Sequence, residues 1–269
     1  MAYKLMAVDI DGTLLNSEGN LTDETRKAIA AGVEKGLIFT ISTGRPLQGV
    51  EHLNRSLNLD LPYITYNGAM VIMGKSKEIL YEQKLSSEDA NRIVELAKKY
   101  NTTFVIWAEN KLFVSEVNER VLKYKEISKV EPIVVNDLQE LLKNGATKIL
   151  WYDEIDKIDQ YQSRVGEYLN DSVNFHTSRP MFLEFVDKKA SKAIAMEKLG
   201  EHFGIKRSEM IAVGDGYNDL SMIEYAGLGV AMANSKDPIK EKADFVTLSN
   251  DEDGVAHVIH KFVLNPAGE

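Results

Sequence analysis

The chain has 269 residues, of which 44% are hydrophobic and 27% are charged, a composition typical of a folded soluble protein. Its 41 acidic residues against 32 Lys+Arg give a formal net charge of −9, which argues against general binding to nucleic-acid phosphates. The chain has no cysteine, which excludes disulfides, thiolate metal sites and cysteine nucleophiles. Since no apolar run reaches about 18 residues, we expect no membrane span and a cytoplasmic protein.

Short apolar runs alternate with helix-like segments in the first and last parts of the chain. The strands expected there are residues 4–8, 37–42, 62–66, 210–213 and 228–231. The helices expected there are residues 23–35, 47–57, 191–203 and 254–263, with a further helix after residue 219. This alternation indicates a parallel sheet with crossover helices.

The middle of the chain has a different pattern, in which a predicted hairpin is followed by short helices that alternate with strands. The expected strands are residues 102–108, 111–116, 147–152, 173–177 and 181–186. The expected helices are residues 86–100, 118–128, 137–144 and 154–169. We therefore predict an α/β protein with a Rossmann-like parallel sheet core, helices on both faces and an inserted α+β domain. The core comprises residues 1–83 and 187–269, and the insert comprises residues 84–186.

Polar side chains follow three of the predicted core strands, at the point where each strand ends. They are Asp9 and Asp11, then Thr43 and Gly44, then Asp215, Asn218 and Asp219. Because ligands bind beyond the carboxyl ends of the strands in open α/β sheets, we expect these segments to meet at one edge. The carboxylates suit a divalent cation, one of them could attack an electrophile, and the helix start after Thr43 suits phosphate oxygens. Taken alone, the first segment usually indicates a simple turn, the second fits a strand end before a helix, and the third fits a helix cap. Their convergence is what favours the functional interpretation.

Four motifs in chain order resemble those of the haloacid dehalogenase superfamily of phosphohydrolases. They are Asp9-Ile10-Asp11-Gly12-Thr13, Thr43-Gly44-Arg45-Pro46, a lysine that opens a late helix, and Gly214-Asp215-Gly216-Tyr217-Asn218-Asp219. The segments Tyr66-Asn67-Gly68-Ala69 and Glu252-Asp253-Gly254-Val255-Ala256 are similar to those of the Cof-type sugar phosphatases. In that subfamily a large α/β cap that selects the substrate is inserted between the second and third motifs.

The resemblance implies a role for each matching residue. Asp9 matches the nucleophile that becomes an aspartyl phosphate, and Asp11 matches the general acid/base. Magnesium is the implied cofactor, and its implied ligands are Asp9, Asp11 and Asp215. The implied phosphate contacts are Ile10, Thr43, Gly44, Lys192 and Asn218. Asp219 is implied to lie behind the metal ligands, and the candidate substrate contacts are Arg45, Asn67 and Gly68.

The lysine of the third motif is assigned to Lys192 rather than to Lys188 or Lys189, because Lys192 lies at the predicted helix start. A glycine commonly follows this lysine in the family, whereas this chain has Ala193. A phosphate monoester dianion repels a carboxylate nucleophile, so the site has to add positive charge before attack. Lys192 and Mg²⁺ would supply that charge.

These features predict a Mg²⁺-dependent phosphatase that acts on small phosphorylated metabolites, with sugar phosphates as the expected class. A sugar phosphomutase that uses the same phosphoaspartate chemistry is the first alternative. The second is a catalytically idle phospho-ligand binder, which the presence of all the catalytic carboxylates disfavours. No nucleic-acid or membrane partner is expected, and the sequence leaves the particular substrate and the oligomeric state open.

Overall fold

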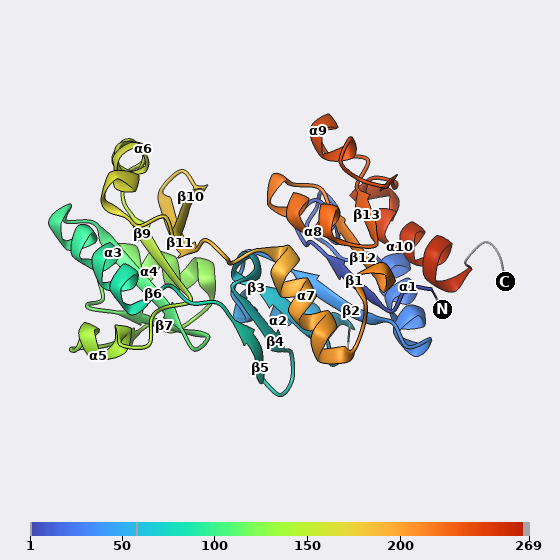
Figure 1. Ribbon diagram of the computed structural model, residues 1–269, viewed down its shortest axis with the longest axis horizontal. Coiled ribbons are helices and arrows are strands. Elements are labelled where there is room, and N and C mark those ends of the chain that lie inside the picture. The colour runs from blue at the N-terminus through green and yellow to red at the C-terminus, as the bar shows by residue number, and fades with distance from the viewer. Residues whose placement is uncertain (1, 58, 266–269) are drawn as a thin grey trace. The chain divides into compact units, whose positions relative to one another are not determined.

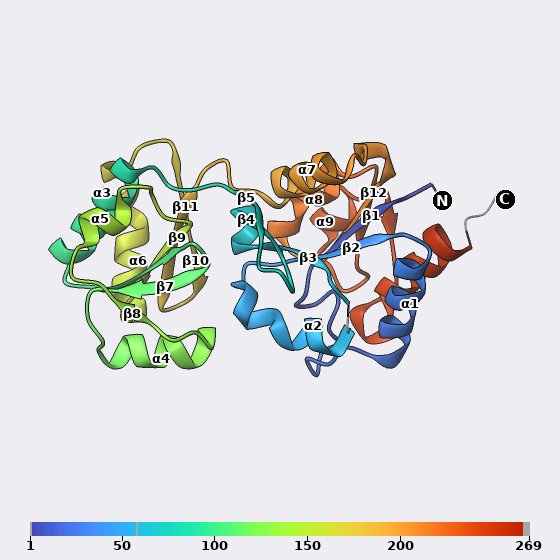
Figure 2. The same cartoon turned by 90° about the horizontal axis from the view of Figure 1, so that it is seen from below.

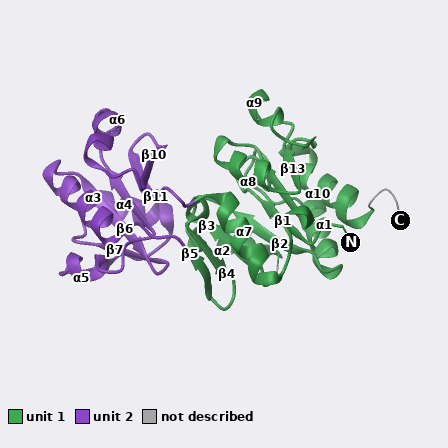
Figure 3. Ribbon diagram, in the orientation of Figure 1, with its two compact units in different colours: residues 1–81, 191–269 green, residues 82–190 purple. Residues whose placement is uncertain are grey.

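The computed structural model describes residues 2–57 and 59–265, and the chain divides into two compact units (Figure 3). Unit 1 comprises Met1–Tyr81 and Ser191–Glu269, and unit 2 comprises Glu82–Ala190. The changes of pattern in the sequence had suggested boundaries at 84 and 187. Each unit has its own sheet and its own buried apolar core, so each is described separately.

The sheet of unit 1 carries the carboxyl ends that concern the site. Its strands are β1 (Leu5–Val8), β2 (Ile38–Ser42), β3 (Pro62–Thr65), β4 (Met70–Met73), β5 (Ile79–Glu82), β12 (Met210–Gly214), β13 (Leu228–Ala231) and β14 (Phe245–Val246). Within the described residues, they form one eight-stranded sheet in the order β14-β13-β12-β1-β2-β3-β4-β5 (Figure 1). Pairing is parallel from β14 to β3, whereas β3 and β4 are antiparallel. The predicted parallel core is confirmed, but β4 was not predicted, because its short apolar run follows a loop-like Asn-Gly pair.

Helices cover both faces of this sheet, as predicted. They are α1 (Asp23–Glu34), α2 (Glu51–Leu57), α7 (Lys192–Phe203), α8 (Leu220–Tyr225), α9 (Asp237–Lys240) and α10 (Gly254–Ile259). Figure 2 shows α7 and α8 on one side of the sheet and α1 and α2 on the other. The helix expected at 47–57 begins instead as a 3₁₀ turn at Leu47–Val50, which contains Gly49, a poor helix former.

Unit 2 is the predicted α+β insert. Its strands are β6 (Thr103–Ala108), β7 (Lys111–Val114), β8 (Ile133–Val134), β9 (Lys148–Tyr152), β10 (Val173–Arg179) and β11 (Phe182–Asp187). Its helices are α3 (Ser87–Lys99), α4 (Glu119–Ser128), α5 (Leu138–Leu142) and α6 (Ile155–Arg164). The strand order is β10-β11-β9-β6-β7-β8.

The core of unit 2 lies between its sheet and the helices α3 and α6, where Trp151 packs against Tyr100, Tyr161 and Phe185. Trp107 is also fully buried, and its Nε1 donates a hydrogen bond to Tyr124 of α4 at 2.9 Å. Both tryptophans therefore belong to the core of this unit. None of the helices in the described part of the chain has the length and apolar character needed to span a bilayer.

Candidate active site

Three aspartates gather at the carboxyl edge of the unit 1 sheet because β1 lies beside β12 in parallel register. Asp9 continues β1, and its N–H donates to the carbonyl of Val213 at 3.0 Å. Asp215 and Asp219 follow β12. One carboxylate oxygen from each of these three aspartates lies within 4.8 Å of the others. The topology thus concentrates negative charge at one point.

Lys192, the second residue of the Ser191-Lys192 helix start, faces this negative charge. Its side chain is only 1% exposed, and its ammonium donates to Asp9 Oδ1 at 2.6 Å and to Asp219 Oδ1 at 2.7 Å. The third N–H donates to the carbonyl of Ser42, at the end of β2, at 2.9 Å. The helix α7 begins here, with the Ser191 hydroxyl accepting from the N–H of Ile194, and its first residue is therefore Lys192.

Burial and the charges of this cluster together shift the pKa values of its members. Burial is the main cause that raises the pKa of the Asp9 carboxyl from 3.8 to about 7, and Asp219 and Asp215 add to the rise while Lys192 opposes it. Burial also raises the pKa of Asp215. Although burial alone would favour the neutral amine, the carboxylates of Asp9 and Asp219 raise the pKa of Lys192. The lysine is therefore a permanent cation, whereas Asp9 needs additional positive charge to be fully ionised at neutral pH.

The three carboxylates differ in the hydrogen bonds that they accept from the protein. Asp219 Oδ2 accepts from the N–H groups of Asp215 and Gly216 at 3.0 and 2.9 Å, while its other oxygen accepts from Lys192. Both oxygens of this carboxylate are engaged by protein donors, which suits a role in positioning Lys192. Asp215 Oδ1 accepts from the Thr13 hydroxyl at 2.8 Å.

A divalent cation fits this donor set. Asp9 and Asp215 offer carboxylate oxygens, the hard ligands that Mg²⁺ prefers, and the chain has no cysteine to favour a softer metal. Gly12 keeps the space open, since a Cβ there would lie 2.5 Å from Asp215 Oδ2. Gly12 also has a φ of +82°, a conformation that other residues rarely adopt.

The second motif packs against the loop after β3. The N–H of Asn67 donates to the carbonyl of Thr43 at 3.0 Å, and the N–H of Arg45 donates to the Thr43 hydroxyl at 3.2 Å. Among the bonds given for residues 2–57 and 59–265, the Thr43 hydroxyl only accepts, so its hydrogen is available to a ligand oxygen. A Cβ at Gly44 would lie 2.9 Å from Asn67 Oδ1, so the Asn67 side chain lies directly over this glycine.

Asp11 lies apart from the other carboxylates. Its side chain is 61% exposed, and both of its oxygens accept from Nη2 of Arg45, at 2.7 and 2.9 Å. The acidic group that could hold a metal among the described residues contains Asp9, Asp215 and Asp219 and does not include Asp11. Of the other predicted site residues, Ile10 is fully buried and Asn218 is exposed.

The sequence interpretation did not assign three features of this site. They are the Thr13 hydroxyl on Asp215, the Ser42 carbonyl on Lys192, and the close approach of Gly68 to the Ser191–Lys192 peptide. A backbone carbonyl leaves no mark in the residue type, and the approach of Gly68 joins segments more than 120 positions apart. Of these three features, only the contact of Thr13 could have been anticipated from the sequence, because Thr13 lies within the first motif.

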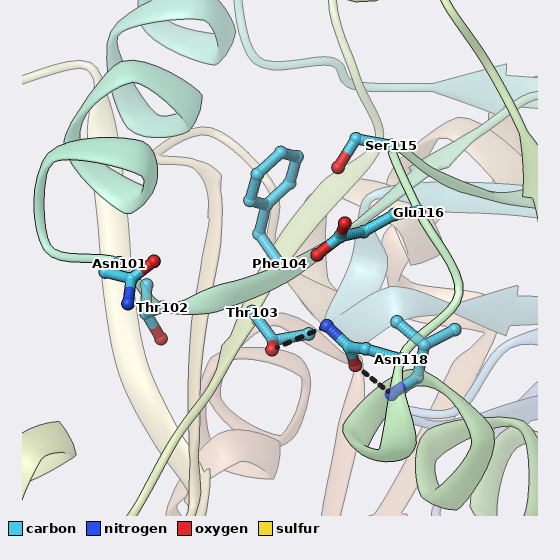
Figure 4. Close-up of a pocket in the computed structure, with 8 residues that line it drawn as sticks. Asn101, Thr102, Thr103, Phe104, Ser115, Glu116 and Asn118 are labelled. Carbon is cyan, nitrogen blue, oxygen red and sulfur yellow. Dashed lines mark hydrogen bonds between the residues drawn. The ribbon is translucent and has the colours of Figure 1, made fainter.

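Unit 2 also has a small polar pocket, with a volume of about 240 Å³, at the start of β6 and the end of β7 (Figure 4). Its lining residues are Asn101, Thr102, Thr103, Phe104, Ser115, Glu116, Asn118 and Val121. Thr103 accepts a hydrogen bond from Asn118 at 3.2 Å, as Figure 4 shows. The lining, as described, includes a carboxylate and no cationic side chain, so the pocket is unsuited to a phosphate group.

The sheet of unit 1 is largely parallel, has helices on both faces and is interrupted in sequence by an inserted domain. Beyond its strand ends, a buried lysine bonds two aspartates. Together these features define the class of the protein. The profile of the haloacid dehalogenase-like hydrolases matches residues 6–259. The chain therefore belongs to this family, as its motifs had suggested.

Known relatives extend the match over almost the whole chain. The 5-amino-6-(5-phospho-D-ribitylamino)uracil phosphatase YcsE of Bacillus subtilis is 37% identical over 264 residues, which cover 97% of this chain and 96% of that protein. A haloacid dehalogenase-like hydrolase from Bacteroides thetaiotaomicron superposes with a TM-score of 0.83 at 34% identity, covering 96% of this chain and 98% of that one. The subclass IIB sugar phosphatase BT4131 has a TM-score of 0.74 at 28% identity, with 96% and 98% coverage. The chain is thus a phosphatase of this family, a phosphoric monoester hydrolase.

Proposed function

We propose that the protein hydrolyses phosphate monoesters of small sugars or polyols in a Mg²⁺-dependent reaction, with Asp9 as the nucleophile. The observation that carries this proposal is the 2.6 Å bond between Lys192 Nζ and Asp9 Oδ1, buried beside the carboxylates of Asp215 and Asp219. Buried, charge-coupled groups with shifted pKa values are a mark of functional sites.

Each side chain of the cluster has a part in the proposed reaction. A free oxygen of Asp9 attacks phosphorus, and the phosphoryl group passes from the substrate alcohol to this carboxylate. Lys192 stabilises the negative charge that spreads over the transferring oxygens, and Asp219 holds the lysine in place. The Thr43 hydroxyl and the N–H of Gly44 bind the phosphate oxygens.

Asp11 is the proposed general acid/base. In the first step it gives a proton to the leaving alkoxide, and in the second step it takes a proton from the water that hydrolyses the aspartyl phosphate. Its exposure beside Arg45 leaves it accessible to both the alcohol and the water. Arg45 is the proposed contact for the phosphorylated substrate, because its guanidinium matches phosphate and carboxylate oxygens.

Asp9 and Asp215 would hold the Mg²⁺ ion, and Thr13 would orient Asp215. When bound, the ion supplies positive charge that offsets the repulsion between the phosphate dianion and the nucleophile. The raised pKa of Asp9 supports this proposal, because a further cation would make this carboxyl fully ionised at neutral pH.

The substrate class rests on relatives. The name of the Bacillus subtilis protein gives it a substrate with a phosphate on a ribityl chain, and the subclass IIB neighbour is named a sugar phosphatase. The ribityl phosphate and the sugar phosphates are all phosphate esters of a polyhydroxylated carbon chain. We propose the same class for this protein, with the leaving group selected by unit 2.

The test is phosphate release from a panel of sugar, polyol and nucleotide phosphates by purified protein. We expect EDTA to abolish release and Mg²⁺ to restore it, with poor restoration by Ca²⁺, which prefers more ligands at longer distances. Full activity after metal removal would overturn the metal proposal. An isomerised sugar phosphate without free phosphate would instead indicate a phosphomutase.

A further inference from the structure

The loop that carries Asp11 begins with a tight turn. The N–H of Leu14 donates to the carbonyl of Asp9 at 3.1 Å, and the N–H of Leu15 donates to the carbonyl of Ile10 at 3.0 Å. Between these bonds the chain reverses through Gly12, which has a positive φ. Asp11 therefore lies at the exposed tip of the turn, and its carboxylate moves with the backbone at Gly12.

A side-chain amide from the turn after β13 bonds that backbone. Asn234 follows β13, and its Nδ2 donates to the carbonyl of Gly12 at 2.8 Å. Its Oδ1 accepts from the N–H of Asn250 at 3.1 Å. Since both ends of the amide are engaged, its orientation is fixed, and the donor is directed at Gly12.

The segment that follows β14 continues this network. Asn250 donates its own Nδ2 to the carbonyl of Leu15 at 2.9 Å, and Asp251 Oδ1 accepts from the N–H of Ser17 at 2.7 Å. The catalytic loop is thus bonded at positions 12, 15 and 17 to residues more than 200 positions away. The Glu252–Ala256 motif adjoins this segment, and the proposed chemistry gives it no other role.

We propose that Asn234, oriented by Asn250, is a positioning residue that fixes Gly12 and thereby the carboxylate of Asp11. The inference rests on the proposed function, in which Asp11 protonates the leaving group. A single hydrogen bond at an exposed site adds little to stability, whereas a displacement of about 1 Å in a catalytic group can cost about 10²-fold in rate. Asn234 should therefore matter more for turnover than for folding.

Two variants of Asn234 test this role. Asn234→Ala removes both bonds, whereas Asn234→Asp keeps an acceptor for Asn250 and turns a carboxylate oxygen toward the Gly12 carbonyl. We expect both to lower kcat for a sugar phosphate by about ten- to a hundredfold with little change in KM. With p-nitrophenyl phosphate, whose leaving group needs little protonation, the step that forms the phosphoenzyme should slow much less. The measurement is the ratio of the two single-turnover rates.

Asp253→Ala is the matched control, because it lies in the same segment but accepts from the hydroxyls of Thr22 and Thr25 at the start of α1. We expect it to lower the melting temperature and leave the ratio unchanged. Mg²⁺ titration by calorimetry should give the same affinity for Asn234→Ala as for the unaltered protein. An unchanged ratio in Asn234→Ala, with the unaltered protein active, would overturn this inference alone. An unaltered protein that releases no phosphate would overturn the proposed function as well.

Discussion

Nη2 of Arg45 bonds both carboxylate oxygens of Asp11, at 2.7 and 2.9 Å, and so links the second motif to the first. The two side chains are 42% and 61% exposed, and ion pairs this exposed contribute at most about 1 kcal/mol to stability. The bond therefore matters for the position of Asp11 and for the charge at the entrance to the site, and little for folding.

Arg45→Ala should accordingly separate activity from stability. We expect kcat/KM for a sugar phosphate to fall by about tenfold or more, because the variant loses a cation beside the phosphate and an anchor for Asp11. The free energy of unfolding should change by less than about 1 kcal/mol. Urea unfolding and steady-state kinetics measure the two effects, and a variant with normal kcat/KM would contradict the role of Arg45.

Lys192→Ala should lower turnover by orders of magnitude, since it removes the cation that faces the reacting oxygens. Lys188→Ala and Lys189→Ala are the matched controls, because both side chains are exposed. We expect these controls to retain most activity. Without the lysine, Asp9 and Asp219 remain buried and uncompensated, at a cost of about 3–5 kcal/mol. Melting temperatures should therefore accompany the rates, and a crippled Lys188→Ala would show that the third motif was misassigned.

The raised pKa of Asp9 predicts that the affinity for Mg²⁺ depends on pH. Folding raises its pKa from 3.8 to about 7, so the metal-free folded state holds an extra proton between these values and loses stability as the pH rises through this window. Mg²⁺ binds the ionised carboxylate, so its affinity should increase with pH up to about 7 and then level off. We expect the Mg²⁺-induced rise in melting temperature to be larger at pH 8 than at pH 5.5.

Asp9→Asn is the control for this experiment, because its amide does not titrate. In that variant Mg²⁺ should stabilise the protein weakly, and the difference between the two pH values should shrink, because only Asp215 of the two proposed ligands still titrates. An equal stabilisation of the unaltered protein at pH 5.5 and pH 8 would refute the coupling between Mg²⁺ and the proton on Asp9.

Gly68 sets the distance between the loop after β3 and the start of α7. A Cβ there would lie 2.2 Å from the Ser191 carbonyl carbon and oxygen, whereas a Cβ at Gly36 would meet nothing within 4 Å. Both glycines have a positive φ, +96° and +94°. Gly36→Ala should cost about 1 kcal/mol of strain, and Gly68→Ala about 2 kcal/mol more from the clash. Similar losses in thermal unfolding would contradict this close approach.

Sequence reasoning reached the fold and the family because they depend on local patterns. A parallel sheet brings the carboxyl ends of its strands to one edge, so the sequence alone predicts that Asp9, Thr43 and Asp215 lie near one another. The bonds of Asn234 to Gly12 and of Lys192 to the Ser42 carbonyl are different. They depend on the exact course of distant loops and on backbone atoms, which every residue type possesses.

Asp11→Asn and Asp9→Asn distinguish the two carboxylates of the first motif. Asp9→Asn removes the nucleophile, so no phosphoenzyme should form from any substrate. Asp11→Asn keeps the nucleophile and removes the proton shuttle. With a sugar phosphate the leaving alkoxide is strongly basic, so the first step should fail. With p-nitrophenyl phosphate, attack by Asp9 can proceed, because nitrophenolate leaves without a proton.

The second half-reaction then shows the role of Asp11 directly. Water has to hydrolyse the aspartyl phosphate without a general base, and this step should slow by about 10²–10⁴-fold. The Asp11→Asn protein should release a burst of nitrophenol near one equivalent and accumulate covalent phosphate, which rapid-quench experiments detect. A Mg²⁺ titration of the variant controls for altered metal binding. If metal binds normally and nitrophenol is released without a burst or trapped phosphate, then Asp11 is not the base of the second step.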